Sequence, residues 1–97
     1  MTKIQIMQSE HVSHVVIDGH QDGPGENIYC AAISALGCTL AEAVRKEKLS
    51  DRPTIHKGDG RLVISYLRTP RTDAFTDMFR EGCEAMAGKY PERYALE

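Results

Sequence analysis

The sequence predicts an α+β fold in which two helices pack on one small sheet. Short β-branched segments come in two pairs, and each pair is followed by a longer segment with helical periodicity. A last short segment, residues 93–97, has the composition of a further strand. The order is therefore β-β-α-β-β-α-β. Hairpins separated by helices favour a small mixed or antiparallel sheet with both helices packed on it.

The length predicts one domain over residues 1–97. A domain of this size buries only about two-thirds of the surface of its unfolded chain, so we expect a modest core. With two Phe, four Tyr and no Trp, that core must be mainly aliphatic.

Four strands are predicted as two hairpins. The first pair covers residues 2–8 and 11–19, and the polar residues between them indicate a tight antiparallel connection. The second pair covers residues 53–57 and 61–67. Gly-Asp-Gly stands between these two segments, which is a strong hairpin signal.

The first helix is predicted over residues 27–48, with Asn27 as its N-cap and Pro53 beyond its end. Gly37 is expected either to bend the helix or to split it. Small residues are expected to let the helix approach the sheet: Ala31, Ala32 and Ala35. Its apolar stripe is predicted from residues three and four apart: Ile28, Ala32, Ala35 or Leu36, Leu40 and Val44.

The second helix is predicted within residues 69–91, with Thr72 as its cap and Asp73 in its first turn. Gly88 and Pro91 mark its end. Its predicted apolar stripe consists of Phe75, Met78, Phe79, Gly82 and Met86.

Composition excludes several classes of function. A net charge of -2 and a pI near 6.1 disfavour direct nucleic-acid binding, which needs clustered Lys and Arg. No apolar run approaches the roughly 20 residues of a membrane span, and the first residues lack the apolar stretch of a signal peptide. The three cysteines have neither metal-ligand nor disulfide spacing, which predicts reduced thiols and a cytoplasmic protein.

A glycine-rich loop joins the two residues with the most reactive chemistry. His20 ends the second predicted strand, and Cys30 follows ten residues later in the first turn of the predicted helix. Cysteine attacks as a thiolate, and a helix N-terminus and a neighbouring imidazole both stabilise that anion. The same backbone N–H groups are able to form an oxyanion hole. We expect the loop, residues 21–26, to be mobile until substrate binds.

The residues alone leave other interpretations open. Free cysteine is often a small buried hydrophobe, and a loop histidine is often simply solvated. Ser34, one turn after Cys30, either donates a hydrogen bond or fills space, and Asp18 either orients His20 or is a surface charge. We interpret Cys38 and Cys83 as core or near-core thiols. A metal site from His20, Cys30, Cys38 and His56 lacks a recognisable ligand spacing, so no metal or other cofactor is expected.

The segment from Gly19 to Ser34 resembles the ribosomal-processing cysteine protease family, Prp. The shared features are Gly-His after the second strand, a glycine-rich loop, a polar residue, two apolar residues, Cys-Ala-Ala, and a serine four residues after the cysteine. The order of elements matches over nearly the whole chain. Two departures stand out: the loop is about two residues shorter than expected, and Asn27 replaces the family's usual aspartate.

The resemblance implies a cysteine endopeptidase with His20 as general base and Cys30 as nucleophile, supported by Gly19, Asn27 and Ser34. It implies a protein substrate, either the N-terminal extension of a large-subunit ribosomal protein or a phage structural precursor, and a homodimer. Its interface is expected to use residues that otherwise complete the monomer core: Tyr66, Leu67, Phe75 and Phe79. The alternative is a non-catalytic ribosome-associated or protein-binding module with the same fold. A redox-sensing thiol protein is a third interpretation, but no resolving cysteine is expected near Cys30.

Overall fold

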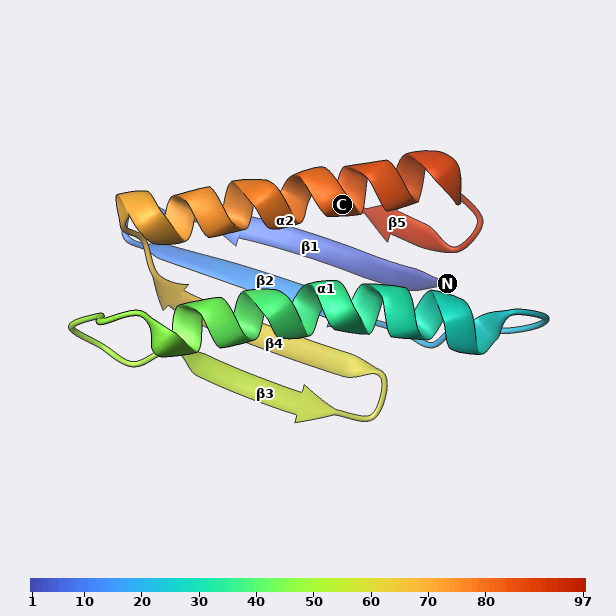
Figure 1. The fold of residues 1–97 in the computed structure, drawn as a ribbon, viewed down its shortest axis with the longest axis horizontal. Coiled ribbons are helices and arrows are strands. Elements are labelled where there is room, and N and C mark those ends of the chain that lie inside the picture. The colour runs from blue at the N-terminus through green and yellow to red at the C-terminus, as the bar shows by residue number, and fades with distance from the viewer.

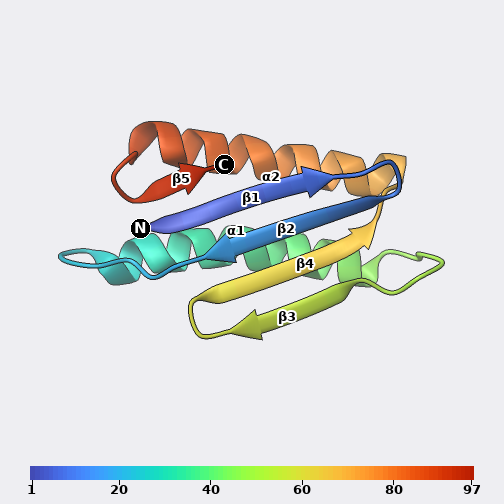
Figure 2. The ribbon, with the colours of Figure 1, turned by 180° about the vertical axis from the view of Figure 1, so that it is seen from behind.

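The computed structural model describes residues 1–97 and places two helices on one face of a five-stranded sheet (Figure 1). Seen from behind, the other face of the sheet carries no helix (Figure 2). The predicted α+β fold and element order are therefore confirmed. The elements are β1 (Thr2–Gln8), β2 (Val12–Asp18), α1 (Glu26–Lys46), β3 (Thr54–Gly58), β4 (Arg61–Leu67), α2 (Pro70–Lys89) and β5 (Tyr94–Leu96).

The sheet has the strand order β3-β4-β2-β1-β5. Its pairs are antiparallel except for β1 and β5, which run parallel, so the sheet is mixed. The pairing of β2 with β4 joins the two predicted hairpins and sets Asp18 opposite Arg61. The end of β2 therefore lies beside the turn between β3 and β4, two regions far apart in the sequence.

Helix α1 begins two residues earlier than a side-chain cap at Asn27 would require. Its N-cap is Gly25, in a left-handed conformation with φ of 82°. The Gly25 carbonyl accepts hydrogen bonds from the N–H groups of Ile28 (3.0 Å) and Tyr29 (3.2 Å), and no side chain caps the helix. The prediction of Asn27 as N-cap is wrong because a glycine with positive φ starts the helix through its backbone.

Helix α2 also begins earlier than predicted. Its N-cap is Thr69, and Pro70 takes the first helical position, where its fixed φ suits the helix. Thr72, predicted as the cap, is instead the third helical residue and completes a capping box with Thr69. The Thr69 Oγ1 accepts from the Thr72 N–H (3.1 Å), and the Thr72 Oγ1 accepts from the Thr69 N–H (2.9 Å).

The core lies between the helices and the sheet. Gly37 is fully helical and neither bends nor splits α1. A Cβ at Gly37 would lie 2.6 Å from Ile17 Cδ1 and 2.9 Å from Leu62 Cδ2, so this glycine permits the close approach that the alanines were expected to provide. The largest part of the core consists of Ile4, Val15, Ile17, Ile33, Leu40, Val44, Ile64, Tyr66, Phe79, Cys83 and Tyr94.

The predicted helix stripes are partly wrong. Ile28 and Met78 are 72% and 75% exposed, and the three alanines Ala31, Ala32 and Ala35 are exposed as well. The reason is that Gly37 turns a different side of α1 to the sheet, and the hydroxyl-bearing side of α2 faces inward. The buried residues are Ile33, Gly37, Leu40, Ala41 and Val44 in α1, and Thr72, Thr76, Phe79 and Cys83 in α2.

Helix α1 is long and apolar enough, by length and composition, to cross a membrane, with a mean hydropathy of 1.4 in its most apolar window. This differs from the expectation that no segment approaches a membrane span. Its inward side packs on the sheet through Ile33, Leu40 and Val44, as in the core helix of a folded domain.

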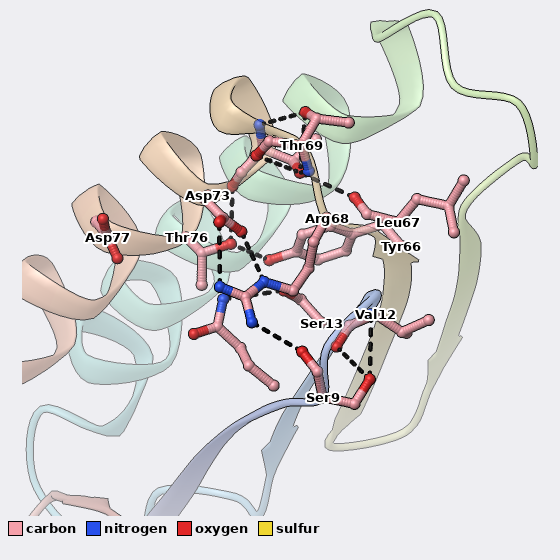
Figure 3. A network of polar contacts seen from close by, with 12 residues as sticks. Ser9, Val12, Ser13, Tyr66, Leu67, Arg68, Thr69, Asp73, Thr76 and Asp77 are labelled. Atoms are coloured by element: carbon pink, nitrogen blue, oxygen red, sulfur yellow. Dashed lines mark hydrogen bonds and ion pairs between the residues drawn. The ribbon is translucent and has the colours of Figure 1, made fainter.

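A polar network joins the start of α2 to the turn between β1 and β2 (Figure 3). Arg68 donates to both carboxylate oxygens of Asp73 (3.0 and 3.1 Å) and to the Ser9 carbonyl (2.7 Å). These bonds with Arg68 hold the pKa of the Asp73 carboxyl below its usual value. Deeper in the network the Tyr66 and Thr76 hydroxyls lie 2.6 Å apart. Side-chain hydrogen bonds therefore hold the turn between β1 and β2 against the start of α2.

Candidate active site

At the opposite end of the sheet a groove of about 260 Å³ runs between α1 and the strands β3 and β4. One wall is a single side of α1 with Cys30, Ser34 and Cys38, which stand four residues apart. The other wall is made by Lys57 and Arg61, and His20 lies at the end of β2. The structure therefore brings the two sequence-predicted residues, His20 and Cys30, to one groove.

The backbone at Gly19 explains how His20 is placed. Gly19 has a φ of 110°, and a Cβ there would lie 2.5 Å from the Met1 carbonyl oxygen, so another residue would be strained and would clash. The Gly19 N–H donates to the Gly60 carbonyl (2.8 Å), which ties the end of β2 to the tip of the β3–β4 hairpin. The backbone conformation and the close approach to Met1 therefore require glycine at position 19, and its supporting role in the site remains a prediction.

The imidazole of His20 lies against the hairpin tip. A Cβ at Gly60, where φ is 67°, would be 2.5 Å from His20 Nε2. The same nitrogen lies 3.5 Å from Asp59 Oδ1. The side chains of Asp59 and His20 are 98% and 61% exposed, so this contact is accessible to solvent. The tip of the β3–β4 hairpin therefore supplies the Asp59 carboxylate, and the lack of a side chain at Gly60 leaves space for the His20 ring.

Asp59, and not Asp18, is the carboxylate beside His20. Asp18 instead contacts Arg61, with 3.4 Å between Oδ2 and Nη1, which makes it the surface charge of the two alternatives left open by the sequence. The sequence analysis missed Asp59 because its role depends on the pairing of β2 with β4. The Gly-Asp-Gly turn was the available signal, but it was interpreted only as a hairpin.

The loop between His20 and Cys30 is held by the residue before β5. The Arg93 guanidinium donates to the carbonyls of Asp22 (2.6 Å) and Pro24 (2.8 Å) and lies 4.4 Å above the Tyr29 ring. The buried Gln21 amide donates in turn to the Arg93 carbonyl (2.6 Å). Sequence reasoning missed Arg93 as well. Mobility of the loop in the absence of substrate remains a prediction.

Cys30 lies in the second turn of α1, since the helix begins at Glu26. Helical side chains lean toward the helix N-terminus, so the Cys30 thiol lies over the turn that contains Asn27. In that turn the N–H groups of Glu26, Ile28 and Tyr29 are bonded to loop carbonyls. The N–H of Asn27, in contrast, makes no backbone hydrogen bond.

The other predicted thiols differ from each other. Cys83 is fully buried, and burial raises the pKa of its thiol to about 12, so it is protonated at neutral pH. Cys38 is only half-buried and lines the groove, where Lys57 Nζ lies 3.5 Å from its sulfur. Of the two alternatives for Cys38, core or near-core thiol, the structure shows the second: it is half-buried, and its side of α1 faces the groove, as does that of the exposed Ser34.

A thiol and an imidazole that line one open groove are groups of the kind that cysteine proteases use. No hydrogen bond joins the His20 ring to the Cys30 thiol in the structure, and such bonds often tighten only when substrate binds. Groups of three or more His, Cys, Asp or Glu side chains suited to a metal ion are absent. The fold and groove thus define a small α+β cysteine protease.

The family model described as cysteine protease Prp matches residues 1–95. The chain belongs to this family. No curated protein matches the sequence.

Solved structures share the fold over the whole chain. Prp from S. aureus, solved with a covalently linked product peptide, is 23% identical with a TM-score of 0.81, covering 100% of this chain and 98% of that one. SMU.848 from Streptococcus mutans is 23% identical with a TM-score of 0.82, covering 100% and 96%. A hypothetical protein from Staphylococcus aureus is 18% identical with a TM-score of 0.71, and both chains are covered fully. At these identities the likeness shows the fold alone.

Proposed function

We propose that this protein is a cysteine endopeptidase in which Cys30 is the nucleophile and His20 the general base. The observation that carries the proposal is that α1 and the end of β2 place these two side chains in one open groove. Asp59 contacts Nε2 of His20, which leaves Nδ1 to exchange a proton with the thiol.

In the first chemical step the Cys30 thiol gives its proton to His20, and the thiolate sulfur bonds to the scissile carbonyl carbon. The Asn27 N–H stabilises the developing oxyanion. The C–N bond then breaks, and the imidazolium gives its proton to the leaving amine. The product of this step is a thioester between Cys30 and the N-terminal fragment of the substrate.

Water completes the cycle. His20 accepts a proton from a water molecule as its oxygen bonds to the thioester carbonyl carbon. The C–S bond breaks, the fragment leaves with a new carboxyl group, and Cys30 is restored. The Asp59 carboxylate orients the imidazole in both steps.

The proposed substrate is a short extended motif in the N-terminal extension of a large-subunit ribosomal protein, or in a phage structural precursor. S. aureus Prp is described as an essential ribosomal processing protease and has been solved with a substrate peptide, and it shares this fold. Membership of the Prp family and the open groove support the same kind of substrate here.

The test is incubation of the protein with bacterial ribosomal precursors that carry N-terminal extensions and with phage capsid and scaffold precursors, followed by mapping of new N-termini. We expect a discrete cut that Cys30→Ala abolishes while the variant keeps the wild-type circular dichroism spectrum. Cys83→Ala is the matched control: it removes a thiol outside the groove, lowers the melting temperature and keeps the cut. Cleavage by Cys30→Ala at the wild-type rate would refute Cys30 as the nucleophile, and absence of any cut by the wild-type protein would favour a non-catalytic binding module.

We also propose that the protein is cytoplasmic, where its three free cysteines stay reduced.

We further propose that the protein forms a homodimer. Exposed Met78 beside half-buried Leu36 and Phe75 on the helix layer supports this association. Tyr66 and Phe79, two residues considered for the interface, are only 2% and 4% exposed and complete the monomer core. Light scattering after size exclusion tests the dimer: a mass that stays near 10.8 kDa on concentration would contradict it.

A further inference from the structure

The groove is cationic in a protein whose net charge is negative. The chain has 14 acidic and 12 basic residues. The residues that line the groove include Lys57, Arg61 and His20 but no aspartate or glutamate. The nearest carboxylates, Asp18 and Asp59, are engaged with Arg61 and His20.

Lys57 is the cation of the groove without a carboxylate partner. In the register of the sheet it stands opposite Leu62, whose side chain is buried on the helix side, so Lys57 also points toward α1. Its ammonium group contacts the Cys38 sulfur at 3.5 Å, and no ion pair includes it. A thiol is a weak hydrogen-bond partner, so the ammonium protons of Lys57 are left for a stronger acceptor.

The helix gives the distance of this cation from the predicted nucleophile. Cys38 follows Cys30 by eight residues on the same side of α1, which corresponds to about 12 Å along the helix axis. An extended peptide advances about 3.3 Å per residue. A peptide that lies along the groove with its scissile bond at Cys30 therefore passes Lys57 three or four residues from that bond.

We propose that Lys57 and Cys38 form a specificity subsite for an acidic side chain, aspartate or glutamate, three or four residues from the cleaved bond. The inference rests on the proposed function, and it adds a substrate class to it. The carboxylate of the substrate accepts hydrogen bonds from Lys57 Nζ. The mapped cleavage sites show whether this acidic residue precedes or follows the cleaved bond.

The experiment uses a synthetic library of random dodecapeptides, with cleavage sites mapped by mass spectrometry. We expect the wild-type protein to cut at sites with Asp or Glu at the third or fourth residue on one side, enriched about fivefold over their frequency in the mixture. Lys57→Met is expected to lose the enrichment. Lys57→Glu is expected to replace it with a preference for Lys or Arg at the same position.

Lys48→Glu is the matched control, since Lys48 is exposed in the loop after α1 and outside the groove. It makes the same change in net charge, so it is expected to keep the acidic preference. Wild-type cleavage without enrichment, or the same enrichment in Lys57→Glu, would overturn the subsite while leaving the protease function intact.

A binding measurement separates failure of the subsite from failure of catalysis. Fluorescein-labelled random octapeptides with one fixed glutamate, and the matching pool with glutamine, are titrated into Cys30→Ala and Cys30→Ala/Lys57→Glu. The subsite predicts that Cys30→Ala binds the glutamate pool about fivefold more tightly, and that the double variant loses this preference. Equal binding of both pools to Cys30→Ala would overturn the subsite whether or not the wild-type protein cleaves.

Discussion

The two helices begin in opposite ways. Helix α2 starts with Thr69, Pro70 and Thr72, whose side chains and ring satisfy or replace its first N–H groups. Helix α1 starts with Gly25, and its first turn makes no side-chain cap hydrogen bond. Around the start of α2, Arg68 adds charged bonds to Asp73 and to the Ser9 carbonyl, whereas the groove is lined by the next turns of α1, from Cys30 to Cys38.

This contrast predicts that the start of α2 contributes mainly to the stability of the fold and the start of α1 mainly to the proposed reaction. Side chains take up the first N–H groups of α2, whereas in α1 loop carbonyls accept from Glu26, Ile28 and Tyr29, and the N–H of Asn27 makes no backbone hydrogen bond. We call the start of α2, which side chains cap, the closed end. We call the start of α1, which has no side-chain cap and precedes Cys30, the open end. Substitutions at the two ends should therefore affect different measurements.

The largest effect is expected from His20→Ala at the open end. Removal of a general base typically lowers the rate by a factor of about 10²–10⁴, and we expect a loss of this size in kcat/KM with a fluorogenic peptide. The melting temperature is expected to change little because the ring is mostly exposed. His56→Ala, in the exposed edge strand β3, serves as the control. A loss below about tenfold would point to another base.

At the closed end, Thr69→Ala is expected to lower the free energy of unfolding by about 1 kcal/mol, which is about fivefold in the equilibrium constant. The change removes the hydroxyl that accepts the Thr72 N–H. Urea denaturation measures it, and kcat/KM at a temperature well below the melting point is expected to stay at the wild-type value. A loss of activity without a loss of stability would contradict the separation of the two ends.

Asp59→Asn is expected to have a smaller effect, a decrease in kcat of up to about fivefold with KM unchanged, because an exposed ion pair contributes at most about 1 kcal/mol. Asp59→Glu is expected to restore part of kcat. Asp51→Asn makes the same change in net charge in an exposed loop and serves as the control. An increase in KM alone would mean that Asp59 contacts the peptide and does not orient His20.

The smallest effect is expected from Asn27→Ala. Because Gly25 and not Asn27 begins α1, loss of the exposed amide is expected to change the free energy of unfolding by less than about 0.5 kcal/mol. Denaturation in parallel with Thr69→Ala gives a direct comparison of the two helix starts. A loss as large as that of Thr69→Ala would restore Asn27 as the cap.

The sequence predicted the order of elements and the pair of residues in the groove because local patterns encode both. Alternation, periodicity and a loop rich in glycine mark strands, helices and the segment between His20 and Cys30. The helix starts were placed wrongly, since a polar residue at Asn27 or Thr72 is a common cap and only the backbone φ identifies Gly25.

The partners of the site depend on contacts between distant segments. Asp59 lies beside His20 because β2 pairs with β4, and Arg93 reaches the loop because β5 pairs with β1 on the other side of the sheet. No local pattern encodes which strands become neighbours. The same holds for the side of α1 that faces the sheet, which the close approach at Gly37 determines.

The hydrogen bonds from Arg93 also couple the local unfolding of β5 to that of the loop between His20 and Cys30. Strand β5 has three residues and lies at the edge of the sheet, a place where local opening requires the least free energy. When β5 detaches, the carbonyls of Asp22 and Pro24 lose their donor, and the buried amide of Gln21 loses an acceptor. The last strand and the loop before Cys30 therefore open as one cooperative unit. On heating, inactivation should precede global melting, because the loop depends on a strand of three residues at the edge of the sheet.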